Sequence, residues 1–491
     1  MRSLKSILAA LSVGAFTLTG PLQKVQASGF AAPSVGPSST GVTTTTDPSV
    51  LAQNPAGIGF VKGTRVIGGG NILIGKLSYQ RERFATYQYS DSLDFALPID
   101  PSLVDPKKRG KEREVSDRPV GLVPSIFGST QLGDLPLVVG LGIYVPYAAM
   151  LHLPKNGPQR FQLTDAFIAA GQFTPTIAYQ PIEELSIGLG VSYVMGYADL
   201  AKTQDLATLS DLGDALARPP IGQSNSFGPN ADPGVRELDT MARPFHFKNG
   251  VANGFTFSAG ITAQPLKDLW LAASYEHTTK MTFRGDFTLD MDDPFFTQDL
   301  QSQGLKYPAL VKGKASLAFT LPRTVRYGIR YGFGEQMGDE RQVNVSLEGS
   351  YTGWSSVDNF DVRIKSPSLA QPMLGLPSST GLKLARAWRD TYGVRTRLRY
   401  LVSEELAVWG MLGIETGASP DSTIDMASPD GTRVHAALGL SQRLTDNVRI
   451  LLDGQLQTIL ERRVASSDYD LGNGTYNLRI LALGGYLDFA F

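Results

Sequence analysis

Hydrophobic and polar residues alternate along most of the chain, from about residue 63 to the end. In one stretch Val343, Val345 and Leu347 alternate with polar neighbours, and near the end Leu487 and Phe489 do the same. A two-residue period is that of a β-strand with one apolar and one polar face, because successive side chains point to opposite sides. The pattern therefore predicts an all-β protein.

Runs of this kind recur throughout the chain. They cover residues 64–82, 118–132, 137–151, 162–179, 184–200, 246–263, 269–287, 312–321, 323–333, 341–356, 383–402, 405–417, 431–444, 446–462 and 475–491. The two runs within 312–333 are separated by Pro322 and can be read as one interrupted strand, so the count is 14 or 15. An even number is the rule for bacterial membrane barrels, which favours 14.

The strands are long, and their apolar faces carry few charges. A transmembrane barrel strand needs about 9–11 residues, and these runs reach that length. A soluble β-sandwich is the alternative, but a soluble barrel of this size would enclose an oversized apolar core. A barrel in lipid turns its apolar faces outward and keeps a polar lumen. We therefore predict a 14-stranded antiparallel transmembrane β-barrel over residues 63–491.

Composition narrows the chemistry. The 491 residues include 45 Lys and Arg against 46 Asp and Glu, a net charge of −1 that gives no reason to expect nucleic acid. The chain has no Cys, which excludes disulfides, Cys-ligated metals and thiol catalysis. Its 4 His residues are scattered and no carboxylates cluster, so neither a metal site nor a cofactor is expected.

The first 27 residues have the pattern of a secretory signal peptide. Arg2 and Lys5 precede an apolar stretch from Ile7 to Leu18, and small residues at Val25 and Ala27 indicate cleavage after Ala27. The apolar stretch is shorter than the about 20 residues of a membrane-spanning helix. A mature barrel that leaves the cytoplasm belongs in the outer membrane of a Gram-negative bacterium.

Residues 28–62 precede the first strand and do not alternate. Asp47 followed by Pro48 is typical of a helix N-cap with proline at the first helical position, which predicts a short helix to about Gln53. Asn54-Pro55-Ala56 then ends it. The segment is either an external tail or a plug (hatch) inside the barrel, and its capping signals favour the hatch.

Two connections are too long for hairpin turns. Residues 201–245 include Leu206 and Leu209 at helical spacing, and residues 288–311 include Phe295 and Phe296. Such helices either pack onto their own loops or offer an apolar ligand a place to bind. A third loop carries the basic run 107–111, which we interpret as solvated or in contact with lipopolysaccharide.

Several short motifs, in order along the chain, resemble the FadL family of outer-membrane channels for long-chain fatty acids and other hydrophobic compounds. They are Ser28-Gly29-Phe30, Asn54-Pro55-Ala56, Gly188-Leu189-Gly190 leading to Lys202, Trp388-Arg389-Asp390-Thr391-Tyr392, and the ending from Tyr486 to Phe491. The loops at 90–117 and 357–381 are longer than the family pattern. The terminal Phe491 resembles the signal that the barrel-assembly machinery recognises, and the resemblance suggests a monomer among outer-membrane lipid and lipopolysaccharide.

The resemblance implies a passive route for a hydrophobic ligand. A groove between two long loops would capture the ligand, and a pocket beside the hatch would then hold it, with Phe30, Leu206, Leu209, Phe295 and Phe296 as ligand-binding candidates. Lys202 and Arg389 match the family's basic residues for the ligand head group. Arg389 would share one face with Arg395, Arg397 and Arg399, opposite Leu384 and Trp388, so Arg389 can equally be an ordinary lumen charge.

Pro146 is the candidate for the lateral exit that the family uses. Proline cannot donate a ladder hydrogen bond, and a barrel has no edge strand to accommodate it, so a bulge or gap is expected in the strand 137–151. The other interpretation is that Pro146 lies in a turn at the rim.

Other functions fit less well. An esterase or phospholipase would need a nucleophile and a base, and no Ser and His stand in a recognisable arrangement, so no catalytic residue is expected. A structural barrel or adhesin would not need a hatch, and a hatch would block a general porin. The sequence leaves open which ligand is carried, fatty acid or hydrocarbon, and whether it is taken up or exported.

Overall fold

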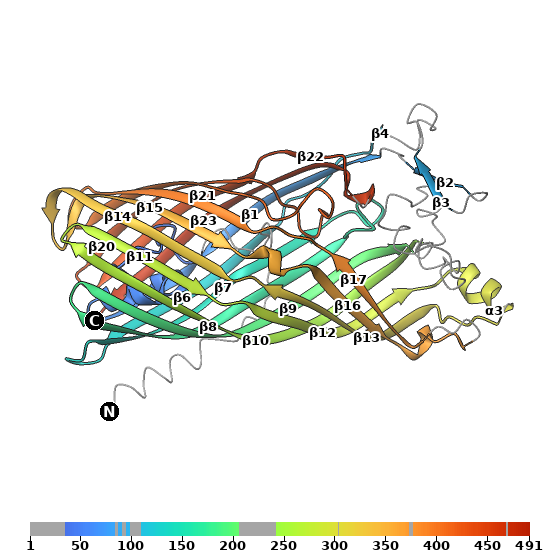
Figure 1. Ribbon diagram of the computed structural model, residues 1–491, viewed down its shortest axis with the longest axis horizontal. Coiled ribbons are helices and arrows are strands. Elements are labelled where there is room, and N and C mark those ends of the chain that lie inside the picture. Colours follow the sequence, from blue (N-terminus) through green and yellow to red (C-terminus); the bar gives the residue numbers. More distant parts are fainter. Residues whose placement is uncertain are drawn as a thin grey trace.

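The computed structural model describes residues 35–83, 87–90, 95–98, 110–205, 242–302, 304–372, 377–467 and 470–491. Within them the chain forms a closed antiparallel barrel of 14 strands (Figure 1). β1 (Thr64–Arg83) closes the barrel, because it pairs with β6 (Val120–Gln131) on one side and with β23 (Gly474–Ala490) on the other. The predicted fold class and strand number are confirmed.

The wall combines continuous strands with strands made of two consecutive pieces. The continuous strands after β6 are β7 (Leu137–His152), β8 (Asp165–Ile182), β9 (Leu185–Asp205), β10 (Ala242–Leu266), β19 (Leu406–Glu415) and β20 (Arg433–Thr445). The divided strands are β11 with β12 (Leu269–Glu276, Thr279–Asp290), β13 with β14 (Leu310–Leu321, Thr324–Met337), β15 with β16 (Glu340–Thr352, Asn359–Lys365), β17 with β18 (Ser379–Ala385, Thr391–Leu401) and β21 with β22 (Val448–Ile459, Arg462–Val464). Short strands β4 (Gly110–Lys111) and β5 (Val115–Asp117) extend β6, and β2 (Tyr87–Ser90) pairs with β3 (Phe95–Pro98) in a separate hairpin.

Pro322 interrupts one strand of the wall rather than separating two. β13 pairs with β12, and β14 pairs with β11, so the two pieces follow the two halves of the neighbouring strand. Proline has no N–H for the ladder, which explains the interruption. The sequence count of 14 or 15 therefore resolves to 14.

The 357–381 stretch is a correction to the sequence analysis, which treated it as a long loop. It contains all of β16 and the start of β17, which pair with each other from Asn359 with Ala385 to Lys365 with Ser379. Phe360, Val362 and Ile364 do alternate with charged residues there. The irregular residues 353–358 interrupt the strand, so the alternation before them does not continue in phase into β16.

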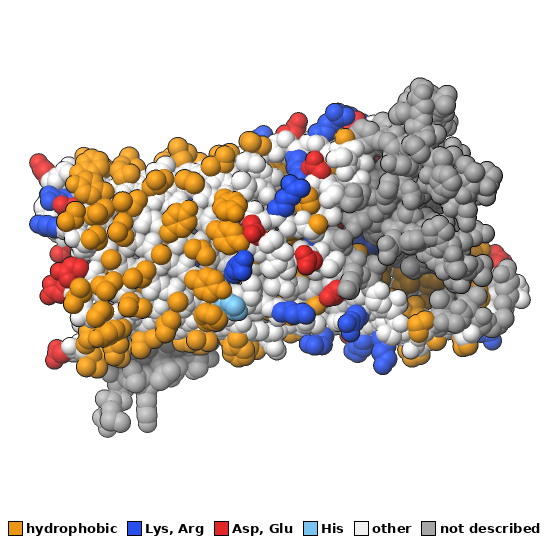
Figure 2. All heavy atoms as spheres, viewed as in Figure 1, with side chains coloured by type: hydrophobic (Ala, Val, Ile, Leu, Met, Phe, Trp, Pro, Cys, Tyr) orange, Lys and Arg blue, Asp and Glu red, His pale blue; other side chains and the backbone are white. Residues whose placement is uncertain are grey.

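The strands present apolar side chains to the outside of the barrel and polar side chains to its lumen. On β14, Tyr327, Ile329 and Tyr331 point outward and are 56%, 41% and 51% exposed, while Arg326 and Arg330 point inward. Figure 2 shows apolar side chains over the half of the barrel near the short turns, and charged side chains gathered beyond them toward the long loops. This is the arrangement of a barrel whose solvent is lipid. Among the described residues, no helix is long and apolar enough to cross a membrane.

Residues 35–62 lie inside the barrel, where Figure 1 draws them in blue. They contain two short 3₁₀ helices, Pro48–Ala52 and Pro55–Phe60. The Asp47 side chain accepts a hydrogen bond from the Ser49 backbone N–H at 3.0 Å, so the predicted cap and the helix that it opens are confirmed. Asn54 caps the second helix in the same way, through the Ala56 N–H.

Candidate functional site

The Asn54-Pro55-Ala56 turn rests against two glycines of the barrel wall. Gly188 of β9 and Gly260 of β10 are register partners and face the turn. A Cβ on Gly188 would lie 2.3 Å from the Ala56 backbone nitrogen, and one on Gly260 would lie 1.9 Å from Asn54 Oδ1. Only glycine allows this close approach of two backbones.

Asn54 is completely buried, and its side-chain amide is fully used. It donates to the Val42 carbonyl at 3.1 Å, to the Ile261 carbonyl at 3.3 Å and to Thr262 Oγ1 at 2.8 Å. The Asn54 side chain therefore joins two turns of the inner segment to strand β10. A buried amide that lost these partners would be costly, on the order of 1–3 kcal/mol.

Arg397 of β18 fixes the start of the inner segment from the opposite wall. Its guanidinium donates to the Ser38 and Thr40 carbonyls, both at 3.1 Å, and pairs with Glu348 of β15 at 3.4 Å. Asp453 of β21 accepts a hydrogen bond from the Ser38 N–H at 2.8 Å. Contacts from several sides of the wall thus hold residues 38–62 across the lumen.

Toward the long loops the lumen changes from polar to aromatic. The aromatic cluster is defined by Phe283, Phe319, Phe360, Trp354 and Trp388, all buried. Its rings contact one another in sequence, with centroid separations of 5.4 Å (Phe283–Phe319), 5.5 Å (Phe319–Phe360), 5.7 Å (Phe360–Trp388) and 5.1 Å (Trp354–Trp388). The cluster forms a continuous, closely packed apolar layer on the inner side of β12, β13 and β16.

Arg386 stands at the edge of the aromatic cluster. Its guanidinium lies 4.3 Å from the centre of the Phe360 ring and pairs with Asp425 at 2.6 Å. The Arg386 side chain is 5% exposed, and its Nε is buried without a hydrogen-bond partner. A buried guanidinium with an unused donor beside an apolar surface can bind the polar end of an otherwise greasy molecule.

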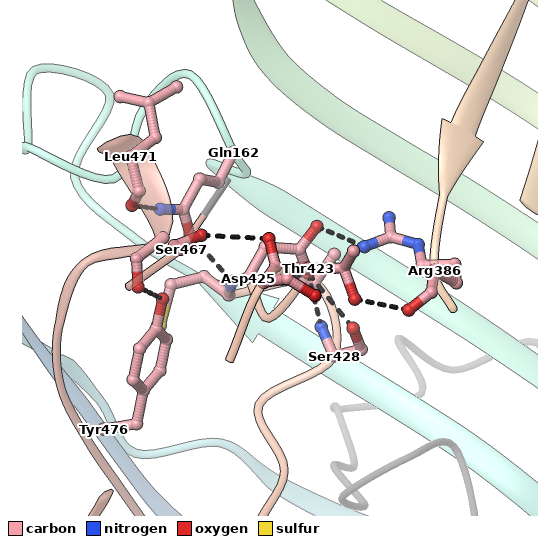
Figure 3. A network of polar contacts seen from close by, with 12 residues as sticks. Gln162, Arg386, Thr423, Asp425, Ser428, Ser467, Leu471 and Tyr476 are labelled. Carbon is pink, nitrogen blue, oxygen red and sulfur yellow. Dashed lines mark hydrogen bonds and ion pairs between the residues drawn. The ribbon is translucent and has the colours of Figure 1, made fainter. Parts of the chain in front are cut away.

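Figure 3 shows how the surrounding polar contacts hold Asp425 in place. Asp425 also accepts hydrogen bonds from Ser428, at 3.0 Å from its N–H and 3.1 Å from its hydroxyl, and Thr423 donates to the Arg386 carbonyl. Gln162 Oε1 accepts from the Met426 N–H at 2.7 Å. Asp425 therefore has hydrogen-bond donors besides Arg386, so its position does not depend on that one ion pair.

The loop between β12 and β13 adds a second aromatic group. Phe295 and Phe296 lie in a short π-helix (Phe295–Asp299), which is followed by α3 (Leu300–Ser302). The Arg243 guanidinium is 5.8 Å from the Phe296 ring centre, and Tyr307 packs against the same ring. Burial raises the pKa of the Tyr307 hydroxyl, so this side chain stays neutral at physiological pH.

The ladder is broken in β7 at Pro146. Pairing with β8 shifts register between Tyr144 and Tyr147, and pairing with β6 extends only from Gln131–Val138 to Ser125–Tyr144. Beyond Tyr144, the backbone ladder of β7 continues only with β8, and β6 residues 120–124 pair only with β1. The expected bulge is confirmed and Pro146 lies within a strand, not in a rim turn. Its role as a gate stays a prediction.

The other residues that the sequence predicted to bind ligand differ in burial, and some lie outside the described residues. Phe30, Leu206 and Leu209 lie outside the described residues. Lys202 is half-buried beside its β10 register partner Phe245, whose ring stacks on Phe287. Arg389 is exposed, and its backbone N–H donates to the Ala418 carbonyl at 2.9 Å.

The expectation that Leu384 and Trp388 face away from the lumen is wrong. Trp388 is 4% exposed within the aromatic cluster, and Leu384 packs against it. Residues 386–390 leave the strand conformation between β17 and β18, and Ala387 has a positive φ of 46°. This irregularity breaks the two-residue period on which the expectation depended. In β18 itself, Arg395, Arg397 and Arg399 do share the inward face, as predicted.

Sequence reasoning missed Arg386 and the Gly188–Gly260 pair. Arg386 stands three residues before Arg389, on the same alternating face as Leu384 and Trp388, which the sequence analysis expected to point away from the lumen. The glycine pair joins residues 72 positions apart and becomes visible only through strand register. Among the described residues, no three His, Asp or Glu side chains come together as metal ligands.

A closed barrel with an apolar outer band, an internal segment and an aromatic lumen is the architecture of an outer-membrane transport protein. The model of the family "Outer membrane protein transport protein (OMPP1/FadL/TodX)" matches residues 21–477. The chain belongs to this family of Gram-negative outer-membrane transporters of hydrophobic compounds. No curated protein matches it in sequence.

Solved structures share the fold at low sequence identity. A Pseudomonas aeruginosa FadL homologue is 16% identical with a TM-score of 0.68, over 96% of this chain and 100% of that one. The toluene transporter TodX of Pseudomonas putida is 15% identical with a TM-score of 0.63, over the same shares of 96% and 100%. TbuX of Ralstonia pickettii, also a toluene transporter, is 15% identical with a TM-score of 0.59, again over 96% and 100%.

Proposed function

We propose that this protein is a passive outer-membrane channel for long-chain fatty acids or similarly elongated hydrophobic molecules. The ligand is captured between the long loops, passes over the aromatic cluster and leaves sideways into the lipid near Pro146. The observation that carries the proposal is the aromatic cluster inside the barrel with buried Arg386 at its edge, because an apolar group beside a cation matches a ligand with an apolar tail and a polar end.

Magnitudes assign separate roles to the two parts of this site. Each buried methylene contributes about 0.8 kcal/mol, so a sixteen-carbon tail contributes on the order of 10 kcal/mol before ordering costs. A charge-assisted hydrogen bond adds about 1.5–3 kcal/mol. The cluster therefore supplies affinity. Buried Arg386, rather than exposed Arg389, supplies orientation, with half-buried Lys202 as a second cation. Neither step needs an energy source, so the concentration gradient sets the direction.

Residues 28–62 act in this proposal as the hatch, a domain distinct from the signal peptide (1–27) and the barrel (63–491). The contacts of Asn54 and Arg397 support a segment that closes the lumen to water and ions. An apolar ligand then has no straight aqueous path to the periplasm. A lateral path into lipid avoids exposing the tail to water.

The gap between β6 and β7 supports that lateral path. Unpaired backbone groups are tolerated at membrane depth only where protein, water or a ligand covers them. A prolyl residue at position 146 keeps the ladder from closing there, since it offers no N–H.

A hydrocarbon substrate is the second candidate, and the Arg386–Asp425 pair favours it. The pair makes the polar edge of the cluster neutral, which suits an uncharged ligand as well as an acid. Two of the structures with this fold are toluene transporters.

Binding to the purified full-length barrel distinguishes the candidates. Native mass spectrometry with palmitate, methyl palmitate and toluene, together with lipids co-extracted from the outer membrane, measures which ligand is retained. Tighter binding of palmitate than of its methyl ester supports a fatty-acid channel. Retention of toluene without either long-chain ligand supports the hydrocarbon channel, and retention of none contradicts both.

A further inference from the structure

Basic residues gather on the outer wall of the barrel, away from the lumen. We define the basic face as Lys280, Arg284, Lys312, Lys314, Arg363 and Lys365, all exposed. They lie on β12, β13 and β16, three neighbouring strands, where Figure 2 shows blue side chains beside the apolar band. Only three acidic residues, Asp286, Asp290 and Asp361, share the outward side of these strands in the described part of the chain.

Strand register brings the cations into rows. Lys314 is the partner of both Asp286 and Lys365, and Ser316 in the next row lies between Arg284 and Arg363. Neighbouring strands are about 4.8 Å apart, so each row spans about the width of a phosphate group and its hydrogen-bonding shell. Like charges directly opposite each other destabilise a sheet, and a bound anion removes that repulsion.

Acidic partners within the protein leave most of this charge uncompensated. Lys314 pairs with Asp286 at 2.5 Å, and both side chains remain largely in contact with solvent. The described residues provide no ion pair for Arg284, Arg363 or Lys365. An external anion therefore finds several unused donors on one surface.

The level of the basic face along the barrel indicates the kind of anion. Directly below it, the lower halves of the same strands carry exposed Leu271, Tyr327 and Ile329, which face lipid tails. The basic face begins where β11 gives way to β12, and it lies on the side of the long loops, which is the cell surface in such barrels. This is the level of the head groups in the outer leaflet.

We propose that the basic face binds the phosphate groups of one lipopolysaccharide molecule, whose acyl chains lie along the apolar band below. Arg284, Arg363 and Lys365 hold the phosphates through charge-assisted hydrogen bonds, and Ser316 contributes a hydroxyl between the two arginines. Multiple acyl chains beneath a phosphorylated head match the combination of apolar and basic surface on these strands. The site is separate from the lumen and from ligand transport.

Lipid binding to the purified full-length barrel tests the proposal. Delipidated protein in detergent is titrated with lipopolysaccharide, with the same material after dephosphorylation, and with phosphatidylglycerol, and native mass spectrometry counts the bound lipid. The double variant R363Q/K365Q removes two cations of the basic face. The double variant K62Q/K267Q removes two exposed cations at the opposite end of the barrel and is the matched control.

We expect R363Q/K365Q to bind lipopolysaccharide about tenfold or more weakly, and K62Q/K267Q to bind as the unmodified protein does. The unmodified protein should bind dephosphorylated lipopolysaccharide more weakly than intact lipopolysaccharide, to a similar extent. This comparison tests the site without any substitution. Equal affinity of R363Q/K365Q, or of the dephosphorylated lipid, would overturn the proposal. Phosphatidylglycerol that binds as tightly as lipopolysaccharide would overturn the choice of occupant.

Discussion

Arg386 and Arg389 are close in sequence but lie in different environments. Arg386 is buried at the aromatic cluster with its Nε unused, whereas Arg389 is exposed. Ala387, which lies between them, has a positive φ of 46°, and residues 386–390 do not continue the strand. The environment of each cation here therefore depends on the irregular connection between β17 and β18.

Replacing Arg386 with Gln should weaken binding of palmitate about tenfold or more, because a charge-assisted hydrogen bond is worth about 1.5–3 kcal/mol. Binding of methyl palmitate should change little, since the ester carries no charge. Isothermal titration with both ligands measures the difference. R389Q is the matched control and should leave both affinities unchanged.

The double variant R386Q/D425N separates head-group binding from the cost of an unpaired Asp425. It keeps the polar edge neutral and should still bind the acid more weakly than the unmodified protein does. Equal losses for acid and ester in R386Q would remove Arg386 from the head-group role. A selective loss of acid in R389Q would return that role to Arg389.

At the scale of elements, the hatch depends on how closely two backbones approach. Replacing Gly188 with Ala places a Cβ 2.3 Å from the Pro55–Ala56 backbone, so the turn must move away from β9. We expect larger single-channel conductance in planar bilayers, because a displaced hatch opens a path for ions. Gly171→Ala in β8 is the control, since its nearest neighbour would be 3.8 Å away. Unchanged conductance of G188A would mean that the turn does not seal the lumen.

The break in β7 makes a separate prediction about the exit. Pro146→Val restores a backbone N–H, which allows the ladder with β6 to lengthen and narrows the gap. Fatty-acid uptake by a strain that depends on this protein should fall, while its abundance in the outer membrane stays normal. Pro175→Val changes an exposed proline within β8, away from the gap, and should leave uptake intact. Normal uptake by P146V at normal abundance would argue against a gate there.

For the whole molecule, alternation was enough to predict the barrel, because each strand must present one face to lipid and the other to the lumen. The strand break at Pro146 and the helix cap at Asp47 could also be predicted from the sequence, since proline and capping residues act locally. The orientations of Trp388 and Arg386 could not be predicted, because they depend on the irregular residues between β17 and β18. The surface that Asn54 packs against could not be predicted either. It depends on the register of β9 and β10, which brings together residues far apart in sequence.

Phe491 extends the contact between β1 and β23, the two strands that close the barrel. The Phe491 N–H donates to the Thr64 carbonyl at 2.9 Å beside the β1–β23 ladder, and the Phe491 side chain is 78% exposed on the apolar outside. Deleting Phe491 removes this hydrogen bond and the exposed ring that the barrel-assembly machinery would recognise. We expect less folded protein in the outer membrane, measured by fractionation and by the mobility shift of unheated barrels in electrophoresis. Phe491→Trp keeps an aromatic ring and the N–H, and should assemble nearly normally. A truncated chain that reaches normal levels with a normal mobility shift would show that the ring and its hydrogen bond are dispensable for closure.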